Sequence, residues 1–210
     1  MSVDIKRLSC ELIQDYFDFF EQRAFTDNSP YRCYCQVYQM SDEENRKIFN
    51  GVKESEVGRV AKAVAQRQIE SGILQGYLAF DYNKAVGWCN CNDKANFPVL
   101  SSTGDSFYFP VAGKEKAVVC FEIAPEWRGR GIATALLQQA VNDAENDGYE
   151  VIDGFPEIRE ERYEWDSRGP VRLFEKCGFS KIVELLCGGY SENVDENEYK
   201  PEVDYAQKGI

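Results

Sequence analysis

The segment 117–156 constrains the fold of this chain more than any other part of the sequence. Residues 117–123 are apolar and β-branched, as in a buried strand, and Pro125 ends the run because proline donates no hydrogen bond to a sheet. Gly129 and Gly131 follow in a short turn, and apolar residues then recur at helical spacing up to Gly148. A second apolar run at 150–155 completes a predicted strand–turn–helix–strand unit.

The turn before the predicted helix has the features of an anion site. A helix N-terminus presents unpaired backbone N–H groups and the positive end of the helix dipole. Gly129 and Gly131 allow a ligand to approach the backbone closely, and Arg128 and Arg130 add charge-assisted donors for phosphate oxygens. A phosphate or pyrophosphate is therefore the expected occupant. An ordinary surface turn with two solvated arginines is the alternative.

Two common phosphate-binding loops do not match this sequence. A P-loop requires Ser or Thr after Gly-Lys, whereas Gly113-Lys114 is followed by Glu115. The dinucleotide pattern Gly-x-Gly-x-x-Gly would begin at Gly129, but Thr134 stands in its third glycine position. Neither class of nucleotide site is predicted here.

The pattern Arg-x-x-Gly-x-Ala at 128–133 resembles the acetyl-CoA-binding motif of the GCN5-related N-acetyltransferases, the GNAT superfamily. A second resemblance lies at 171–179, where Val-Arg-Leu-Phe-Glu-Lys-Cys-Gly-Phe is similar to the late helix and strand of that family. Residues 76–89 are similar to its central hairpin. Together these matches cover roughly residues 76–188.

The resemblance implies a mixed α/β (α+β) fold. Its central sheet would be mixed, mostly antiparallel and twisted, splayed apart at the two motif strands and flanked by helices. One acetyltransferase domain is expected over 1–190, with helices predicted at 11–25, 42–50 and 52–72 beside the acceptor cleft. Residues 191–210 contain six acidic and two basic residues, so we expect a mobile or loosely docked acidic tail.

The resemblance also implies an activity, the transfer of acetyl from acetyl-CoA to a primary amine of a small molecule or peptide by direct attack. The pantetheine arm would lie between the two motif strands, with the thioester carbonyl held by backbone groups near Ile123. The residues implied to bind acetyl-CoA are Ile123, Arg128, Gly129, Arg130, Gly131, Ile132, Ala133, Thr134 and Phe174.

Glu122 and Asp153 are the candidate general bases, because each stands on a motif strand where some relatives carry the base. A buried carboxylate there would have a raised pKa, which suits proton transfer near neutral pH. The alternative for each is a solvated or hydrogen-bonded strand carboxylate.

One position departs from the family pattern. Many relatives carry a tyrosine in the late helix as the general acid for the leaving thiolate, and here that position is Phe174. Tyr163, Tyr190, Cys177 or water could take its place. A protein that binds acyl-CoA as a sensor or regulator, without chemistry, is the alternative function.

Composition restricts the other possibilities. The chain has no histidine, which excludes Ser-His-Asp and Cys-His catalysis. A net charge of −12 argues against nucleic-acid binding and favours a cationic acceptor. The sequence shows no transmembrane or signal segment, so we expect a cytoplasmic protein without a membrane partner. A homodimer is considered beside the monomer.

Eight cysteines include two Cys-x-Cys pairs, at 33–35 and 89–91. Structural zinc sites use wider spacings, so no metal is expected, and the cysteines are interpreted as small buried hydrophobic residues. A zinc-stabilised interaction protein built on these pairs is the third hypothesis.

Overall fold

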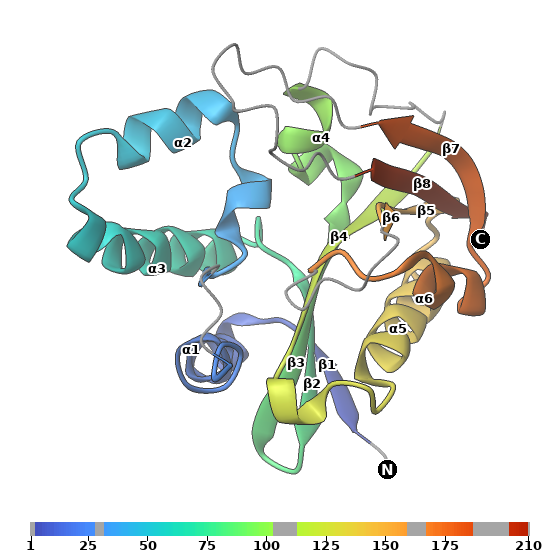
Figure 1. Cartoon of the computed structure of the whole chain (residues 1–210), viewed down its shortest axis with the longest axis horizontal. Coiled ribbons are helices and arrows are strands. Elements are labelled where there is room, and N and C mark those ends of the chain that lie inside the picture. Colours follow the sequence, from blue (N-terminus) through green and yellow to red (C-terminus); the bar gives the residue numbers. More distant parts are fainter. Residues whose placement is uncertain (1–2, 28–31, 103–112, 159–166, 187–201, 210) are drawn as a thin grey trace.

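The computed structural model describes residues 3–27, 32–102, 113–158, 167–186 and 202–209 of the 210-residue chain. In these ranges a single mixed sheet carries helices on both of its faces (Figure 1). The helices are α1 (Ile13–Gln22), α2 (Asp42–Phe49), α3 (Glu54–Glu70), α4 (Val99–Ser102), α5 (Ile132–Asn146) and α6 (Val171–Lys176). The strands are β1 (Asp4–Arg7), β2 (Gly76–Asp81), β3 (Lys84–Asp93), β4 (Glu115–Ile123), β5 (Val151–Gly154), β6 (Glu157–Ile158), β7 (Ser180–Leu186) and β8 (Glu202–Gly209).

The sheet has the order β1-β2-β3-β4-β5-β8-β6, with β7 also paired to β8. The pair β4–β5 is parallel, and α5 connects these two strands. The other described pairs are antiparallel. This arrangement confirms the predicted fold class and the predicted strand–turn–helix–strand unit.

A β-bulge in β4 positions the functional site. Asn90 of β3 pairs with Cys120, and the next residue, Cys91, pairs with Val118. Val119 is therefore the extra residue of the bulge. On its other side, β4 pairs with β5 only as far as Val118, opposite Gly154. Bulges bend a strand and redirect its side chains. From Val119 to Ile123, β4 therefore continues without β5 beside it.

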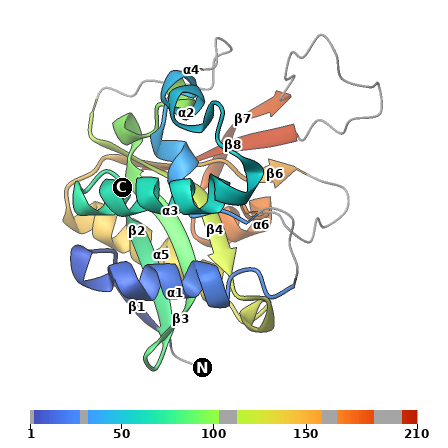
Figure 2. The ribbon, with the colours of Figure 1, turned by 90° about the vertical axis from the view of Figure 1, so that its left-hand side faces the viewer.

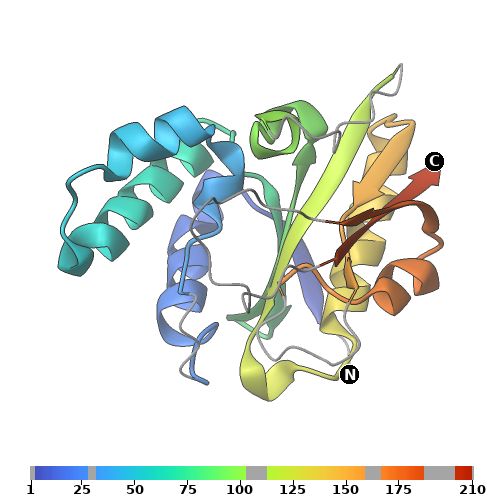
Figure 3. The ribbon, with the colours of Figure 1, turned by 45° about the horizontal axis from the view of Figure 1, so that its top comes forward.

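Two apolar layers hold the sheet between the helices. On one face, Tyr16 and Phe20 of α1 pack on Trp88 of β3, in a cluster that includes residues of α3. On the opposite face, Leu136 and Leu137 of α5 lie in a cluster with residues of α6 and of the central strands. Figures 2 and 3 show these two helical layers on either side of β2–β4. The end of β4 is thus bordered by helices from both layers.

The C-terminal segment corrects one expectation. We expected 191–210 to be a mobile or loosely docked acidic tail, and for β8 this is wrong, because the strand lies between β5 and β7. Strand pairing uses backbone groups, so an acidic composition does not prevent it. The side chain of Gln207 also donates a hydrogen bond to Asp153 Oδ1 (3.1 Å). Residues 191–201 lie outside the described ranges, and the single-domain division stays a prediction.

Gly154, at the end of β5, must lack a side chain. A Cβ at this position would overlap the ring of Phe174, which is fully buried. Gly154→Ala is therefore expected to lower the free energy of unfolding by about 1–3 kcal/mol, the usual cost of overpacking. Urea denaturation followed by circular dichroism measures it. The control is Gly58→Ala in α3, where a Cβ meets nothing within 4 Å and alanine is expected to stabilise by up to about 1 kcal/mol. Equal stability of the Gly154→Ala variant and the native protein would contradict the packing argument.

Candidate functional site

The N-terminus of α5 is open on the side of the preceding turn. Gly129 and Gly131 have left-handed φ values of +74° and +82°, and a Cβ on either would meet nothing within 4 Å. Gly131 is the N-cap of α5, and no side chain caps the helix. The N–H groups of the first helical turn, which includes Ile132, Ala133 and Thr134, have no partner within the helix. These groups and the helix dipole make a site suited to an anion.

Gly87 of β3 lets α5 begin directly on the sheet. A Cβ there would lie 2.8 Å from Ile132 Cγ2 and 3.0 Å from Ile123 Cδ1. Ile132 is buried, whereas Ala133 and Thr134 are partly exposed. The close contact brings the helix N-terminus next to the end of β4.

The two arginines of the turn point in different directions. Arg130 is exposed and its guanidinium lies 4.9 Å from the centre of the Trp127 ring. Arg128 instead turns back to β4, where its Nε donates to the carbonyl of Ile123 (3.1 Å). Its Nη1 lies 2.6 Å from Asp27 Oδ2, and its Nη2 lies 3.4 Å from Glu122 Oε1. In this structure the side chain of Arg128 therefore binds two carboxylates and does not point toward the N-terminus of α5.

Glu122, the first of the two predicted bases, lies near the end of β4. Its side chain is 14% exposed. Burial raises the pKa of Glu122 from 4.5 to about 7, against the opposing effect of Arg128. A carboxylate with this pKa exchanges protons near neutral pH.

The open edge of β4 is contacted by the segment before α6. The backbone N–H of Phe121 donates to the carbonyl of Ser167. The Ile123 carbonyl accepts from Arg128, so these two backbone groups of the edge have partners within the chain. A ligand that lies along β4 here would replace these bonds.

Residues 36–179, more than half of the chain, match the sequence profile of the acetyltransferase (GNAT) family. The chain belongs to this family. No curated protein sequence matches it significantly.

Solved structures with the same fold are distant in sequence. A GNAT-family protein from Desulfovibrio desulfuricans is 13% identical with a TM-score of 0.58, over 99% of each chain. The polyamine N-acetyltransferase of Drosophila melanogaster is 11% identical, with a TM-score of 0.53 over all of both chains. A Salmonella typhimurium protein, solved with its cofactor acetyl-CoA, is 12% identical with a TM-score of 0.50, over 100% of this chain and 94% of the other. At these identities the likeness shows the fold.

Asp153, the second predicted base of this GNAT chain, lies in a buried ion-pair network. Lys94 Nζ lies 2.6 Å from Asp153 Oδ2 and 2.9 Å from Glu115 Oε2. The three side chains are 0–8% exposed. Burial lowers the pKa of Lys94, but its bonds to the two carboxylates outweigh burial and raise it. Because Asp153 is buried and bound to Lys94, we carry only Glu122 forward as the candidate base.

Removing the cation of this network is expected to destabilise the protein strongly. Lys94→Met would remove a cation that is paired with two buried carboxylates, which costs about 3–5 kcal/mol of unfolding free energy. Urea denaturation at pH 7 measures the loss.

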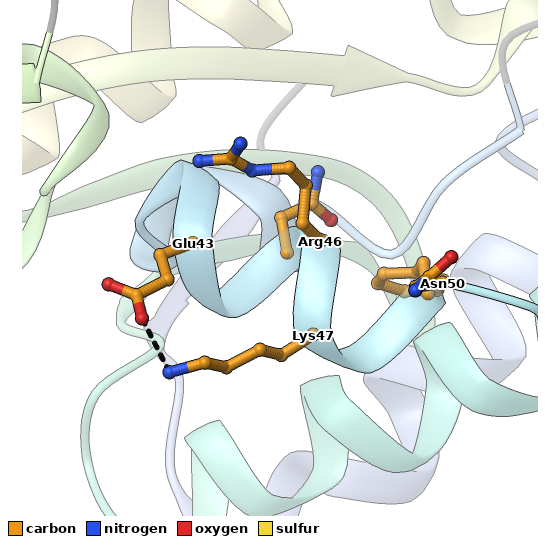
Figure 4. Close-up of a pocket in the computed structure, with 6 residues that line it drawn as sticks. Glu43, Arg46, Lys47 and Asn50 are labelled. Carbon is orange, nitrogen blue, oxygen red and sulfur yellow. Dashed lines mark ion pairs between the residues drawn. The ribbon is translucent and has the colours of Figure 1, made fainter.

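The matched control is Lys47→Met on α2. Lys47 forms an ion pair with Glu43 (Figure 4) at 2.6 Å, and both side chains are 70% exposed. A change within about 0.5 kcal/mol is therefore expected. This pair lies on a hollow of about 620 Å³ along α2, which none of the candidate site residues lines. If the two variants lost equal stability, the buried network would not be a stabilising element.

Phe174, at the position where many relatives carry the acid, is buried in the core. Its ring lies edge-to-face on Phe121 (6.1 Å between ring centres) and on Phe179 (5.2 Å). The side chain is 1% exposed and belongs to the apolar layer between the sheet and α5. Of the possible substitutes, Cys177 is buried with its Sγ 4.0 Å from the carbonyl of Thr134, and burial raises the pKa of this thiol. Tyr163 and Tyr190 lie outside the described residues.

The two Cys-x-Cys pairs lie on opposite faces of the sheet. Cys33 and Cys35 pack in the layer of α1 and α3, whereas Cys89 and Cys91 pack in the layer of α5. A single four-cysteine site is therefore not formed by these pairs. Within the described ranges, no three Cys, Asp or Glu side chains are placed to hold a metal ion. The expected burial is confirmed for Cys35, Cys89, Cys91 and Cys120, whereas Cys33 is only partly buried. Cys187 lies outside the described residues.

Sequence reasoning missed the partners of the site residues. Asp27, Lys94 and Glu115 determine how Arg128 and Asp153 are used, and no motif marks any of them. The residues next to each of them in the sequence also give no sign that the side chain is buried or paired.

Among the described residues, none of the helices has the length and apolar character of a membrane span.

Proposed function

We propose that this GNAT protein is an N-acetyltransferase that transfers acetyl from acetyl-CoA to the primary amine of a small molecule or peptide. One observation carries the proposal: the uncapped N-terminus of α5, with Gly129 and Gly131 before it, lies next to the end of β4 that bears Glu122. An anion site and a proton acceptor thus adjoin one open strand edge.

The residues would divide the work as follows. Backbone N–H groups from Gly129 to Thr134 and the side chain of Arg130 would bind the pyrophosphate. The pantetheine arm would run along β4 beyond Val118, where β5 no longer pairs. It would replace the Ser167 carbonyl as the hydrogen-bond acceptor of the Phe121 N–H. Backbone groups near Ile123 would hold the thioester oxygen and stabilise charge that develops on it.

The reaction itself needs one proton acceptor. The amine nitrogen attacks the thioester carbon, the new C–N bond forms, and the C–S bond breaks. An acceptor that binds as the ammonium gives one proton to the Glu122 carboxylate before attack, and its nitrogen loses a second proton to solvent as the tetrahedral intermediate collapses. The CoA thiolate leaves and takes a proton from solvent, because Phe174 has none to give. Holding both reactants in line supplies much of the remaining rate enhancement.

A second candidate is an acyl-CoA-binding regulator without chemistry. Two observations favour it: Phe174 is buried where many relatives carry the acid, and Ser167 occupies the Phe121 N–H. The named polyamine N-acetyltransferase among the structural neighbours favours the enzyme with an amine acceptor. A cytoplasmic location, a homodimer and the absence of nucleic-acid and membrane partners stay predictions.

Calorimetric titration followed by a turnover assay tests the proposal. Acetyl-CoA and CoA are expected to bind, and NAD and ATP are not. CoA release is then measured with a panel of primary amines that includes polyamines and short peptides. Binding without turnover by any amine would favour the regulator, and no binding of acetyl-CoA would reject both candidates.

A further inference from the structure

The guanidinium of Arg128 lies where the proposed reaction needs the acceptor amine. It touches the Ile123 carbonyl, beside the proposed thioester position, and it lies between the carboxylates of Glu122 and Asp27. Both carboxylates are 14% exposed, and Arg128 is 23% exposed. A cation is therefore bound between two largely buried carboxylates, one of which is the candidate base.

This cation belongs to the motif that faces the proposed pyrophosphate site. Arg128 precedes Gly131, the N-cap of α5, by three residues in a turn that contains Gly129. A guanidinium group can bind either a carboxylate or a phosphate through two of its N–H groups. A pyrophosphate at the α5 N-terminus would thus compete with Asp27 and Glu122 for one side chain.

We propose that Arg128 holds the place of the acceptor ammonium in the free protein and moves to the CoA pyrophosphate when acetyl-CoA binds. The Asp27–Glu122 pair then receives the cationic amine. Asp27 acts as a positioning residue that holds the ammonium charge, and Glu122 takes its proton. This inference rests on the proposed acetyl-CoA site, and it names the acceptor subsite and an order of binding, with acetyl-CoA first.

The exchange has a consequence for protonation. The groups around Glu122 are Arg128 and the Ile123 N–H, which lower its pKa, and Asp27, which raises it. The thiols of Cys33, Cys35 and Cys120 also lie within its electrostatic reach. Loss of the Arg128 cation removes a lowering effect, so the pKa of Glu122 rises from about 7. A rise of about one unit takes Glu122 from half to about nine-tenths protonated at pH 7 in the CoA complex, an uptake of about 0.4 proton. The acceptor ammonium then restores a cation beside Glu122, which lowers this pKa again and returns the carboxylate that takes the proton.

Calorimetry in two buffers of different ionisation enthalpy measures this uptake. Wild-type protein is expected to take up about 0.4 proton when CoA binds at pH 7, and none when pantetheine, which lacks the pyrophosphate, binds. Arg128→Ala and Glu122→Gln are expected to lose the uptake, whereas Arg59→Ala, in an exposed pair on α3, retains it. Equal proton exchange in wild type and Arg128→Ala would overturn the inference. No CoA binding by wild type would instead refute the proposed function.

Asp27→Asn separates positioning from a structural role. The variant releases Arg128 from a competing partner, so CoA is expected to bind as tightly as in wild type or more tightly. With the amine identified by the panel, its KM is expected to rise at least about tenfold, as for a lost charged contact. The control is Glu145→Gln, an exposed carboxylate on α5. Weaker binding of both CoA and amine by Asp27→Asn would mean that Asp27 only supports the fold.

Discussion

Replacing Gly131 with aspartate is expected to abolish acetyl-CoA binding. Gly131 caps α5 with a φ of +82°, and the space around it is open. An aspartate there would place a carboxylate in front of the helix N-terminus, where it repels the pyrophosphate and competes for the same N–H groups. Calorimetric titration with acetyl-CoA measures the effect.

The backbone strain of this substitution has its own control. Gly51 also has a left-handed φ, +77°, and it lies between α2 and α3, where a Cβ would meet nothing within 4 Å. Gly51→Asp therefore introduces a similar strain of about 1 kcal/mol and the same charge away from α5. It is expected to bind acetyl-CoA normally. Unchanged affinity in the Gly131→Asp variant would refute the site.

Glu122→Gln is expected to lower kcat by about 10²–10⁴, the range attributed to one acid–base group. Glu122 accepts a proton only as a carboxylate, and its pKa is raised to about 7 by burial. In the native protein kcat reports the complex with both substrates bound, in which the acceptor cation stands beside Glu122 in place of Arg128, and it should therefore rise with pH through about pH 7. The glutamine variant should lose this step. Initial rates of CoA release between pH 5.5 and 9, a range of about 1.5–2 units on each side of the step, measure both effects.

Glu126→Gln is the matched control, because Glu126 is exposed in the turn after β4. It is expected to keep the native rate and pH profile. A Glu122→Gln variant with the native pH profile would show that another group is the base, even if its rate were reduced.

The parts of the candidate site that the sequence predicted depend on residues that are close together in the chain. Pro125, Gly129, Gly131 and the helical apolar spacing act over a few residues, so the strand, the turn and α5 could be predicted without any tertiary contact. The expected hydrophobic face of α5 is the one that packs on the sheet.

The use of the charged residues could not be predicted in this way. Arg128 meets Asp27 across 101 positions of the sequence. Lys94, which follows β3, lies beside Asp153 of β5 because β4 pairs with both strands. The segment at the C-terminus shows the same limit, because its acidic composition predicted a tail and its backbone forms β8. Amino-acid composition describes only the side chains of a segment. Strand pairing depends on its backbone groups and on a sheet edge, here that of β5, with which they can form hydrogen bonds.

The sequence by itself determined where the glycine turn and the open helix N-terminus form, because glycines, proline and helix periodicity act on the backbone within one contiguous segment. Only the tertiary structure decided which of the two strand carboxylates stays partly exposed with a raised pKa and which is buried against a lysine. Burial and the distance to a cation control that choice, and both depend on segments that fold together from distant parts of the sequence. Asp153 and Glu122 look alike as strand carboxylates, and the fold pairs one with Lys94 in the core and leaves the other at the open end of β4 beside Arg128.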